Sequence, residues 1–536
     1  MSPPLAAVTA ATVQGLVPEI LLVAAAITIY LVGAFTSFRS GWLLAFVGVA
    51  IPLWLATPEG GDPLTMFGRW TTLAAGMALV LVQGGDVRPA AHRRLGTCEE
   101  AGTFLILLAG LSLVAAADNL ILLFVGLEMV SIPTYVLLGL TRSSARGQEA
   151  ALKYFFLSLV ASAIFLYGMV CLYGIGGDVN LSAIAEKLRS GDLTTERMTL
   201  ALLPLAVGML MVGAAFRMAA VPMQFYAPDV YEGTSTPLAG VLSTLPKLAG
   251  VVVLVRFLGL AAGSNQPGGL AYAELFWQVA AVLAALTMTV GNLMALVQSN
   301  LRRLLACSSI AHAGYLLVGI TAAAAGASSL TEASTDQLKG ADATLYYLAT
   351  YLLATTGVFA AITYLGHRWP IWSPTTPRPP REEVSTVADL DGLASTNPVV
   401  AFALAVFLLS LAGVPPLPGF WGKLSLVTSL LEVDRGMPIT MDGRRIWLLA
   451  LAITLVINAA IAAAYYLRLI AAMYFRQADR GVQADGGLSA GLAMLGCLII
   501  SLMGTIAPGM LAITEDPTPS SDTPPSVASL DPTHHE

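Results

Sequence analysis

The sequence predicts an all-α integral membrane protein with about fourteen transmembrane helices. Of its 536 residues, 56% are hydrophobic and only 11% are charged, whereas about a quarter of the residues in a typical soluble protein are charged. The apolar residues gather in long runs, and a helix of about 20 such residues crosses about 30 Å of hydrocarbon. These runs favour one helical bundle over the several soluble domains that the length alone would allow.

Fourteen segments qualify as spans, and we divide them into three, five, five and one. They lie near 16–37, 41–57, 69–84, 100–117, 119–141, 151–175, 198–219, 236–262, 273–297, 303–325, 343–366, 398–431, 446–474 and 489–513. We predict an N-terminal unit at 1–99, five-helix repeats at 100–262 and 273–474, and a last span at 489–513. We expect a disordered tail at 515–536, and an extended cytoplasmic crossing in the Pro-rich segment 369–380.

Two spans carry proline where a helix would have to break. The first break follows Phe216 and contains Pro222 and Pro228, and the second is the Pro- and Gly-rich segment 411–423. Proline removes a backbone donor, and unwound backbone at membrane depth persists only where protein or water satisfies it. The breaks fall in spans 7 and 12, five spans apart, so the two five-helix units would enter the membrane from opposite faces. The sequence therefore predicts inverted repeats, each with a broken helix beside an ion path.

The basic residues predict the orientation. Connections after odd-numbered spans hold more Lys and Arg than connections after even-numbered spans. Because basic loops stay in the cytoplasm, we expect both termini outside it.

Several function classes lack support. The net charge is −6 and no long basic run occurs, which argues against nucleic-acid binding. The four cysteines are scattered and form no C-x-x-C pair, so neither a metal site nor an iron–sulfur site is indicated. Neither a P-loop nor a G-x-G-x-x-G motif after a strand is present, and no nucleophile–base pair suggests hydrolysis. We therefore expect no cofactor on this chain.

Three ionisable residues fall deep within apolar spans. Glu128 lies near the middle of span 5, Lys247 well inside span 8, and Lys423 directly after the second break. An unpaired charge in hydrocarbon is costly, so such residues usually line an ion path or pair with each other. The alternative for Glu128 is a satisfied helix contact, and for the lysines it is snorkelling toward the surface. We favour proton transfer for all three.

Four further residues are weaker candidates. Lys153 opens span 6 four residues after Glu149, a spacing that also fits a simple helix ion pair. His312 lies about halfway along span 10, where a neutral imidazole can relay a proton or serve only as a core residue. Asp229 and Glu232 are expected at the cytoplasmic mouth, where they would take up protons or cap a half-helix.

Taken together, these motifs resemble the antiporter-like subunits of proton-pumping NADH-quinone oxidoreductase, respiratory complex I. The similarity runs from about residue 100 to 475, and the length and number of spans are most similar to subunit N of that complex. The resemblance rests on the stretches around Glu128 and Lys247 and on segments 216–217, 228–233, 302–312 and 418–423.

The resemblance implies a role for each matched position. Glu128, Lys247, His312 and Lys423 would form the proton route, and Arg217 stands where the family has a lysine. Arginine stays protonated in proteins, so Arg217 would act as a fixed counter-ion, or water would carry that step. NADH, FMN, iron–sulfur clusters and quinone are expected on other subunits, and neighbouring antiporter-like subunits as partners in a bacterial inner membrane.

Three alternatives remain open at this stage. The same module occurs in multi-subunit sodium/proton antiporters and in membrane-bound hydrogenases. A stand-alone transporter for a small solute would need a discrete pocket at the membrane midplane. A purely structural subunit would use its buried charges only for pairing.

Overall fold

The computed structural model describes residues 15–36, 40–55, 62–86, 97–141, 144–190, 196–261, 267–327, 333–368, 382–433, 435, 443–477 and 486–506. The predicted disordered tail at 515–536 and the predicted extended crossing at 369–380 lie outside these residues. The described part is almost entirely helical, which confirms the predicted fold class.

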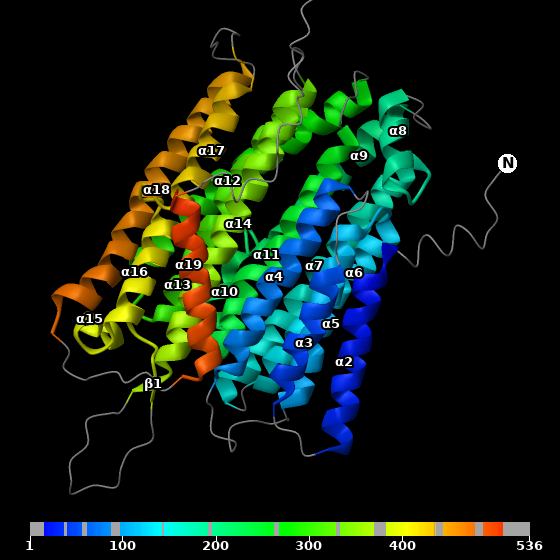
Figure 1. Ribbon diagram of the computed structural model, residues 1–536. Helices are drawn as coiled ribbons and strands as arrows, with labels where there is room; N and C mark the ends of the chain where they lie inside the picture. Colours follow the sequence, from blue (N-terminus) through cyan, green and yellow to red (C-terminus); the bar gives the residue numbers. More distant parts are fainter. Residues whose placement is uncertain are drawn as a thin grey trace, which may run out of the picture.

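The long helices run side by side through one bundle (Figure 1). Their bounds are α2 Val17–Phe35, α3 Gly41–Leu55, α4 Pro63–Gly84, α5 Thr97–Ala116, α6 Leu120–Thr141, α7 Ala145–Gly176, α9 Glu196–Met218, α11 Thr236–Leu258, α12 Pro267–Leu296, α13 Leu301–Ala327, α14 Ala333–Leu365, α16 Pro398–Ala412, α17 Pro418–Glu432, α18 Arg444–Phe475 and α19 Leu488–Ile506. The short elements are α8 Leu181–Ser190, η2 Gln224–Tyr226, α10 Ala227–Gly233, η3 Gly259–Ala261, β1 His367–Arg368, β2 Glu382–Glu383, η4 Val387–Leu390 and α15 Leu393–Thr396.

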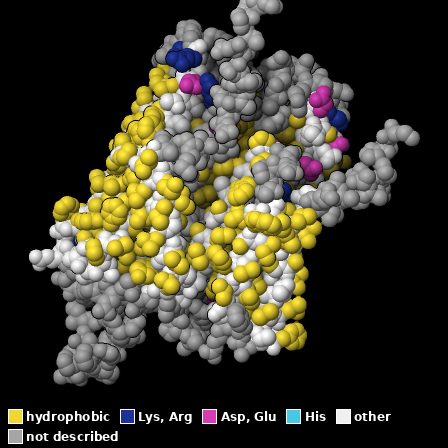
Figure 2. Space-filling view, in the orientation of Figure 1, with side chains coloured by type: hydrophobic (Ala, Val, Ile, Leu, Met, Phe, Trp, Pro, Cys, Tyr) yellow, Lys and Arg dark blue, Asp and Glu magenta, His cyan; other side chains and the backbone are white. Residues whose placement is uncertain are grey.

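The apolar helices match the predicted spans. Among the described residues, eleven helices are long and apolar enough to cross a membrane, and three shorter apolar helices bring the number to fourteen. The third span begins at Pro63 rather than near residue 69, because proline suits the first turn of a helix and Leu64, Met66 and Phe67 extend the apolar run ahead of Arg69. Large apolar side chains cover the flanks of the bundle, and the visible charges gather near one end (Figure 2). This distribution suits a surface that lipid covers.

Both predicted breaks are present. Helix α9 ends at Met218, the next residue Ala219 has a positive φ of 56°, and the chain resumes helical structure in η2 and α10. Helix α16 ends at Ala412, Gly413 has a φ of 86°, and α17 begins at Pro418. The span predicted at 398–431 therefore consists of two half-helices, as its proline-rich break predicts.

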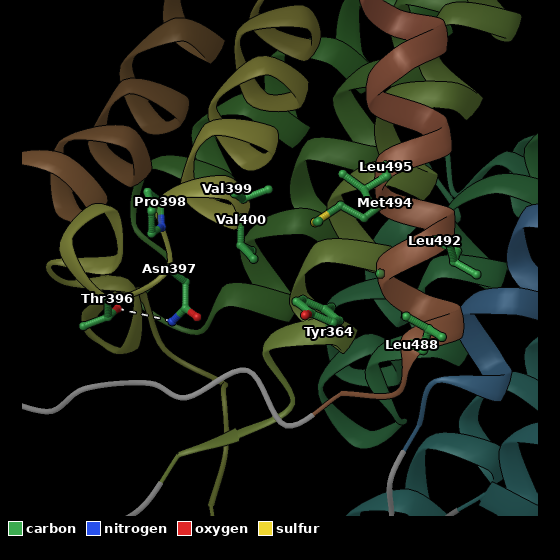
Figure 3. Close-up of a pocket in the computed structure, with 11 residues that line it drawn as sticks. Tyr364, Thr396, Asn397, Pro398, Val399, Val400, Leu488, Leu492, Met494 and Leu495 are labelled. Atoms are coloured by element: carbon green, nitrogen blue, oxygen red, sulfur yellow. Dashed lines mark hydrogen bonds between the residues drawn. The ribbon is translucent and has the colours of Figure 1, made fainter.

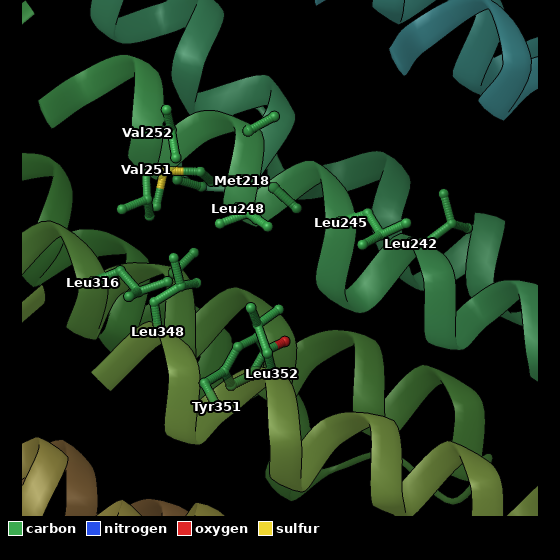
Figure 4. Close-up of a cluster of buried hydrophobic side chains, with 14 of the residues drawn as sticks. Met218, Leu242, Leu245, Leu248, Val251, Val252, Leu316, Leu348, Tyr351 and Leu352 are labelled. Carbon is green, nitrogen blue, oxygen red and sulfur yellow. The ribbon is translucent and has the colours of Figure 1, made fainter. Parts of the chain in front are cut away.

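The centre of the bundle joins the earlier and later spans. Every residue of α13 is buried except Arg303, which is partly buried, and α11 is almost as fully enclosed. Apolar side chains fill the space between α9, α11, α13 and α14, including Met218, Leu248, Leu316 and Leu348 (Figure 4). Figure 1 places α11, α13 and α14 between α2–α7 on one side and α16–α18 on the other. Polar groups in this core consequently have no bulk water nearby.

A short hairpin closes one end of the core. Strands β1 and β2 pair antiparallel, and the chain after β2 pairs with the α12–α13 connection through Leu301 N–H to Ser385 O at 2.8 Å. The carboxylate of Glu383 accepts from Arg302 at 2.7 Å and from Thr236 at 2.8 Å. The hairpin thus ties the first turns of α11 and α13 together.

We predict that Gly413→Ala destabilises the fold by about 1–2 kcal/mol, because an L side chain is strained in the left-handed region. The added Cβ would also lie 2.9 Å from Cδ of Lys423. Thermal unfolding in detergent measures the effect. Gly208→Ala is the matched control, since nothing lies within 4 Å of its added Cβ. Equal stability of the two variants would contradict a required glycine at the break.

Candidate functional site

Glu128 and Arg217 form an ion pair between α6 and α9. Nη2 of Arg217 lies 3.4 Å from Oε1 of Glu128, which also accepts from the hydroxyl of Ser162 at 2.6 Å. Nη1 of Arg217 donates to the carbonyl of Leu127 at 3.0 Å and to Ser131 at 2.7 Å. Arg217 is buried, whereas the Glu128 side chain keeps 28% of its surface exposed. The arginine is fixed by several partners, and the carboxylate remains reachable.

Lys247 lies on α11, where 1% of its surface is exposed. Pro246 precedes it within the helix, and proline cannot donate to the preceding turn. The ammonium of Lys247 donates to the hydroxyl of Ser309 on α13 at 2.6 Å. Ser309 in turn lies 3.0 Å from the hydroxyl of Tyr351 and 3.4 Å from that of Tyr231. The lysine therefore opens onto a chain of hydroxyl groups rather than onto a carboxylate.

His312 follows Ser309 by three residues on α13, so the two side chains share a helix face. Its Nδ1 lies 2.6 Å from the hydroxyl of Tyr347, and its Nε2 lies 2.9 Å from the hydroxyl of Tyr466. Tyr466 also contacts the hydroxyl of Ser308. Both ring nitrogens thus have a hydroxyl partner, and a hydroxyl can donate or accept. This arrangement can pass a proton through the imidazole in either direction.

Lys423 lies in the first turns of α17, next to the second break. Its ammonium donates to the carbonyls of Leu411 at 2.9 Å and Ala412 at 2.8 Å. These are the last two residues of α16, where carbonyls lack helical partners. Nζ also lies 4.9 Å from the ring centroid of Tyr315 on α13. The break thus supplies the groups that hold the lysine.

An ion network links three helices at the end of the bundle where α7 and α13 begin. Asp229 on α10 accepts from Lys153 on α7 at 2.8 Å and from Arg303 on α13 at 2.8 Å. Arg303 also donates to Glu232 at 2.8 Å, and Lys153 keeps the expected pair with Glu149 at 2.7 Å. The hydrogen bond from Lys153, with that from Arg303, holds the pKa of Asp229 below its usual value. Both carboxylates of α10 thus form ion pairs.

The structure brings together most of the residues that the sequence singled out, in three groups. Glu128 pairs with Arg217, and Lys247 joins Ser309, whose partner Tyr351 has its ring against that of His312. Asp229 pairs with Lys153, and Arg303 joins Asp229 to Glu232. Within the described residues, no side-chain hydrogen bond joins Arg217 to Lys247 or Lys423 to His312.

Sequence reasoning missed the connecting groups. They are Ser309, Tyr231, Tyr315, Tyr347, Tyr351, Tyr466 and Arg303. The spacing of Tyr347 and Tyr351 by one helical turn was the available signal, because it places two hydroxyls on one face of an apolar helix.

No metal-binding cluster accompanies these groups in the described part of the chain. Groups of three or more His, Cys, Asp or Glu that would hold a metal ion are absent there. A cavity of about 370 Å³ lies between α14, α16 and α19, lined mainly by apolar side chains such as Val400, Leu492 and Met494 (Figure 3). It shares no lining residue with the polar groups described above.

Comparison with known proteins identifies the family. A family model described as "NADH:quinone oxidoreductase/Mrp antiporter, TM" matches residues 117–443, a range that contains Glu128, Arg217, Lys247, His312 and Lys423. This chain belongs to that family. Within the NADH:quinone oxidoreductase/Mrp antiporter family, its curated relatives include NADH-quinone oxidoreductase subunit N 2 of Roseiflexus castenholzii, 38% identical over 87% of this chain and 88% of that protein. NADH-quinone oxidoreductase subunit N of Trichlorobacter lovleyi is 32% identical over 92% of this chain and 94% of that protein.

Solved structures agree with the fold. A chain of respiratory complex I from Thermus thermophilus aligns with a TM-score of 0.70 and 28% identity, covering 93% of this chain and all of that chain. A chain of the Mrp complex from a Dietzia species aligns with a TM-score of 0.70 at 19% identity. The alignment covers 93% of this chain and 96% of that chain. The second likeness shows the fold alone.

We predict that Asp229→Asn loosens α10, because it weakens the pairs with Lys153 and Arg303. Asp229 contributes this stability above its unfolded pKa of about 4, and loses it only as the pH falls through its lower folded pKa. At neutral pH, amides in Ala227–Gly233 should exchange about two- to fivefold faster, given the modest strength of exposed ion pairs. Hydrogen exchange with mass spectrometry measures this. The control is Glu186→Gln at an exposed site on α8; the same exchange rate in both variants would refute the role of the network.

Proposed function

We propose that this chain is the proton-translocating membrane subunit of an NADH-quinone oxidoreductase, and that it couples electron transfer on other subunits to proton movement. The observation that carries the proposal is a run of buried contacts: Lys247 donates to Ser309, Ser309 contacts the hydroxyl of Tyr351, and the Tyr351 ring lies 4.9 Å from the ring of His312, between centroids. The proposal is also supported by relatives named NADH-quinone oxidoreductase subunit N, whose similarity covers 87% and 92% of this chain. NADH, FMN, iron–sulfur clusters and quinone belong, in this proposal, to partner subunits.

In the first half, Glu128 is the group that loads and releases a proton. Its carboxylate is partly exposed and touches both a hydroxyl and the guanidinium of Arg217. Arg217 stays charged throughout and acts on Glu128 through its field. Since Arg217 cannot relay a proton, water carries the step from Glu128 toward Lys247.

In the second half, the proton passes from Lys247 to His312 and then to Lys423. Hydroxyl groups bridge the first transfer, because each can accept one proton while donating another. Lys423 is the last titratable side chain of the route, and it lies at a break where unwound backbone can meet water.

Asp229, Glu232 and Lys153 form the cytoplasmic mouth of this route. Their ion network lies beside α10, whose Tyr231 reaches Ser309. We place this face in the cytoplasm from the distribution of basic residues, with both termini outside and the protein in a bacterial inner membrane.

We further propose the division into an N-terminal unit at 1–99, inverted five-helix repeats at 100–262 and 273–474, and a last span at 489–513. Support comes from the two breaks, which each pair a half-helix with a residue of positive φ, Ala219 or Gly413.

The main alternative is a membrane subunit of a sodium/proton antiporter or a membrane-bound hydrogenase. The likeness to the Mrp chain is one of fold at 19% identity, whereas the identity to proteins named subunit N reaches 38%. Neighbouring genes for NADH- and quinone-binding subunits distinguish the two. Solute uptake by the purified chain alone would indicate an independent transporter instead.

We predict that Glu128→Gln lowers proton pumping at least about tenfold, because an amide cannot take up the proton that a general base carries. The assembled complex in vesicles is assayed for protons pumped per NADH oxidised. Assembly is checked by the amount of complex recovered. Unchanged pumping in fully assembled complex would remove Glu128 from the route and favour a structural role.

We predict that Arg217→Lys retains most of the coupled rate, whereas Arg217→Ala loses about tenfold or more. Lysine keeps a positive charge beside Glu128, but alanine leaves the carboxylate without its cation. The same pumping assay compares the two variants. If they behave alike, a positive charge at this position is not needed.

A further inference from the structure

Lys423 is held without a carboxylate. None of the ion pairs formed by the described residues includes it, and its two hydrogen bonds go to backbone carbonyls. Only 6% of its surface is exposed. An ammonium group in such a place needs compensating negative potential, since burying a bare charge costs far more than burying a polar group. The carbonyls at the end of α16 supply part of it, because the C-terminus of a helix carries partial negative charge.

The aromatic face of Tyr315 supplies the remaining partner. An ammonium has three N–H donors, and the two carbonyls engage two of them. Nζ lies over the ring at 4.9 Å from its centroid, within the range in which the negative face of an aromatic ring attracts a cation. The same ring makes an edge contact with His312, with centroids 5.5 Å apart and planes inclined by 80°. Tyr315 therefore touches both His312 and Lys423.

A pair of buried asparagines fixes this ring. Nδ2 of Asn292 on α12 donates to the hydroxyl of Tyr315 at 3.1 Å, and also lies 3.1 Å from Oδ1 of Asn458 on α18. Oδ1 of Asn292 accepts from Tyr465 at 3.1 Å, and Nδ2 of Asn458 donates to Thr289 at 3.2 Å. Both amides are buried, so a swing of the Tyr315 side chain away from Lys423 would leave buried polar groups without their hydrogen-bond partner. The two asparagine amides therefore hold the Tyr315 side chain in place without adding charge.

We propose that the ring of Tyr315 stabilises the ammonium form of Lys423 in place of a carboxylate, and that the Asn292–Asn458 pair positions the ring for this task. An aromatic face attracts a cation but has no proton to exchange with it. Lys423 can therefore take up a proton without a neighbouring carboxylate, which would hold the lysine in its charged form. The inference rests on the proposed role of Lys423 in proton transfer. It adds two positioning residues on α12 and α18 to that role.

The test removes the negative potential of the ring while keeping its shape. Tyr315→Phe keeps the aromatic face but loses the hydroxyl that Asn292 holds, so it should lose about as much pumping as Asn292→Leu. Replacing Tyr315 instead by mono-, di- and trifluorotyrosine keeps the hydroxyl and weakens the face stepwise, and pumping should fall stepwise to about one tenth. Protons pumped per NADH oxidised are measured in vesicles that contain the full complex. The same fluorinated series at Tyr272, a buried ring on α12 to which the proposal gives no part, should leave pumping unchanged.

Three further results decide the matter. In an Asn292→Leu background, pumping should no longer fall as fluorines are added at position 315. A ring that has moved away from Lys423 no longer acts on the charge of the lysine. A flat series at position 315 in the parent, with Lys423→Gln inactive, would overturn the role of the ring while leaving the proposed function intact. Full pumping by Lys423→Gln would defeat the proposed function at this residue and the inference with it.

Discussion

The structure depends on how positive charge is satisfied inside a bundle that faces hydrocarbon. A charge there cannot be hydrated as it is in bulk water, so each cation needs protein partners. Arg217 receives a carboxylate, a carbonyl and a hydroxyl, whereas Lys247 receives a hydroxyl. Lys423 receives two carbonyls and a ring face. The partners thus change from ionic at Arg217 to neutral at Lys247 and Lys423.

The broken helices make this possible because they free backbone groups at depth. The last carbonyls of α16 reach Lys423 only because the chain turns aside at Gly413. The aliphatic part of the Lys423 side chain passes over Gly413, where an added Cβ would lie 2.9 Å from Cδ of the lysine. At the other break, the short helix α10 carries Asp229 toward α7 and α13 and carries Tyr231 toward Ser309. One break holds a charge, and the other connects the surface network to the buried chain of hydroxyls.

The sequence predicted those features whose cause is local. The prolines predicted both breaks, and the length of the apolar runs predicted the spans. The scarcity of charged residues within those spans indicated Glu128, Lys247 and Lys423. The connecting hydroxyls were not predictable in the same way. Serine and tyrosine are common in apolar helices, and whether Ser309 meets Lys247 depends on how α11 and α13 rotate against each other. That rotation is fixed by packing of residues such as Leu248 and Leu316, which follows from tertiary contacts rather than from any one helix.

The two halves differ in net charge, and this difference bears on how they would communicate. With Glu128 ionised, its pair with Arg217 is neutral, and protonation of Glu128 leaves a net positive charge there. The chain from Lys247 to Lys423 contains no carboxylate among its described hydrogen-bonding partners, so every proton it gains adds positive charge. Like charges in a medium of low dielectric repel strongly. Under the proposed function, loading of Glu128 therefore opposes simultaneous loading of Lys247, and Lys247 opposes Lys423 in turn. Protons would then move one at a time, because each group accepts its proton most readily after the next has released its own.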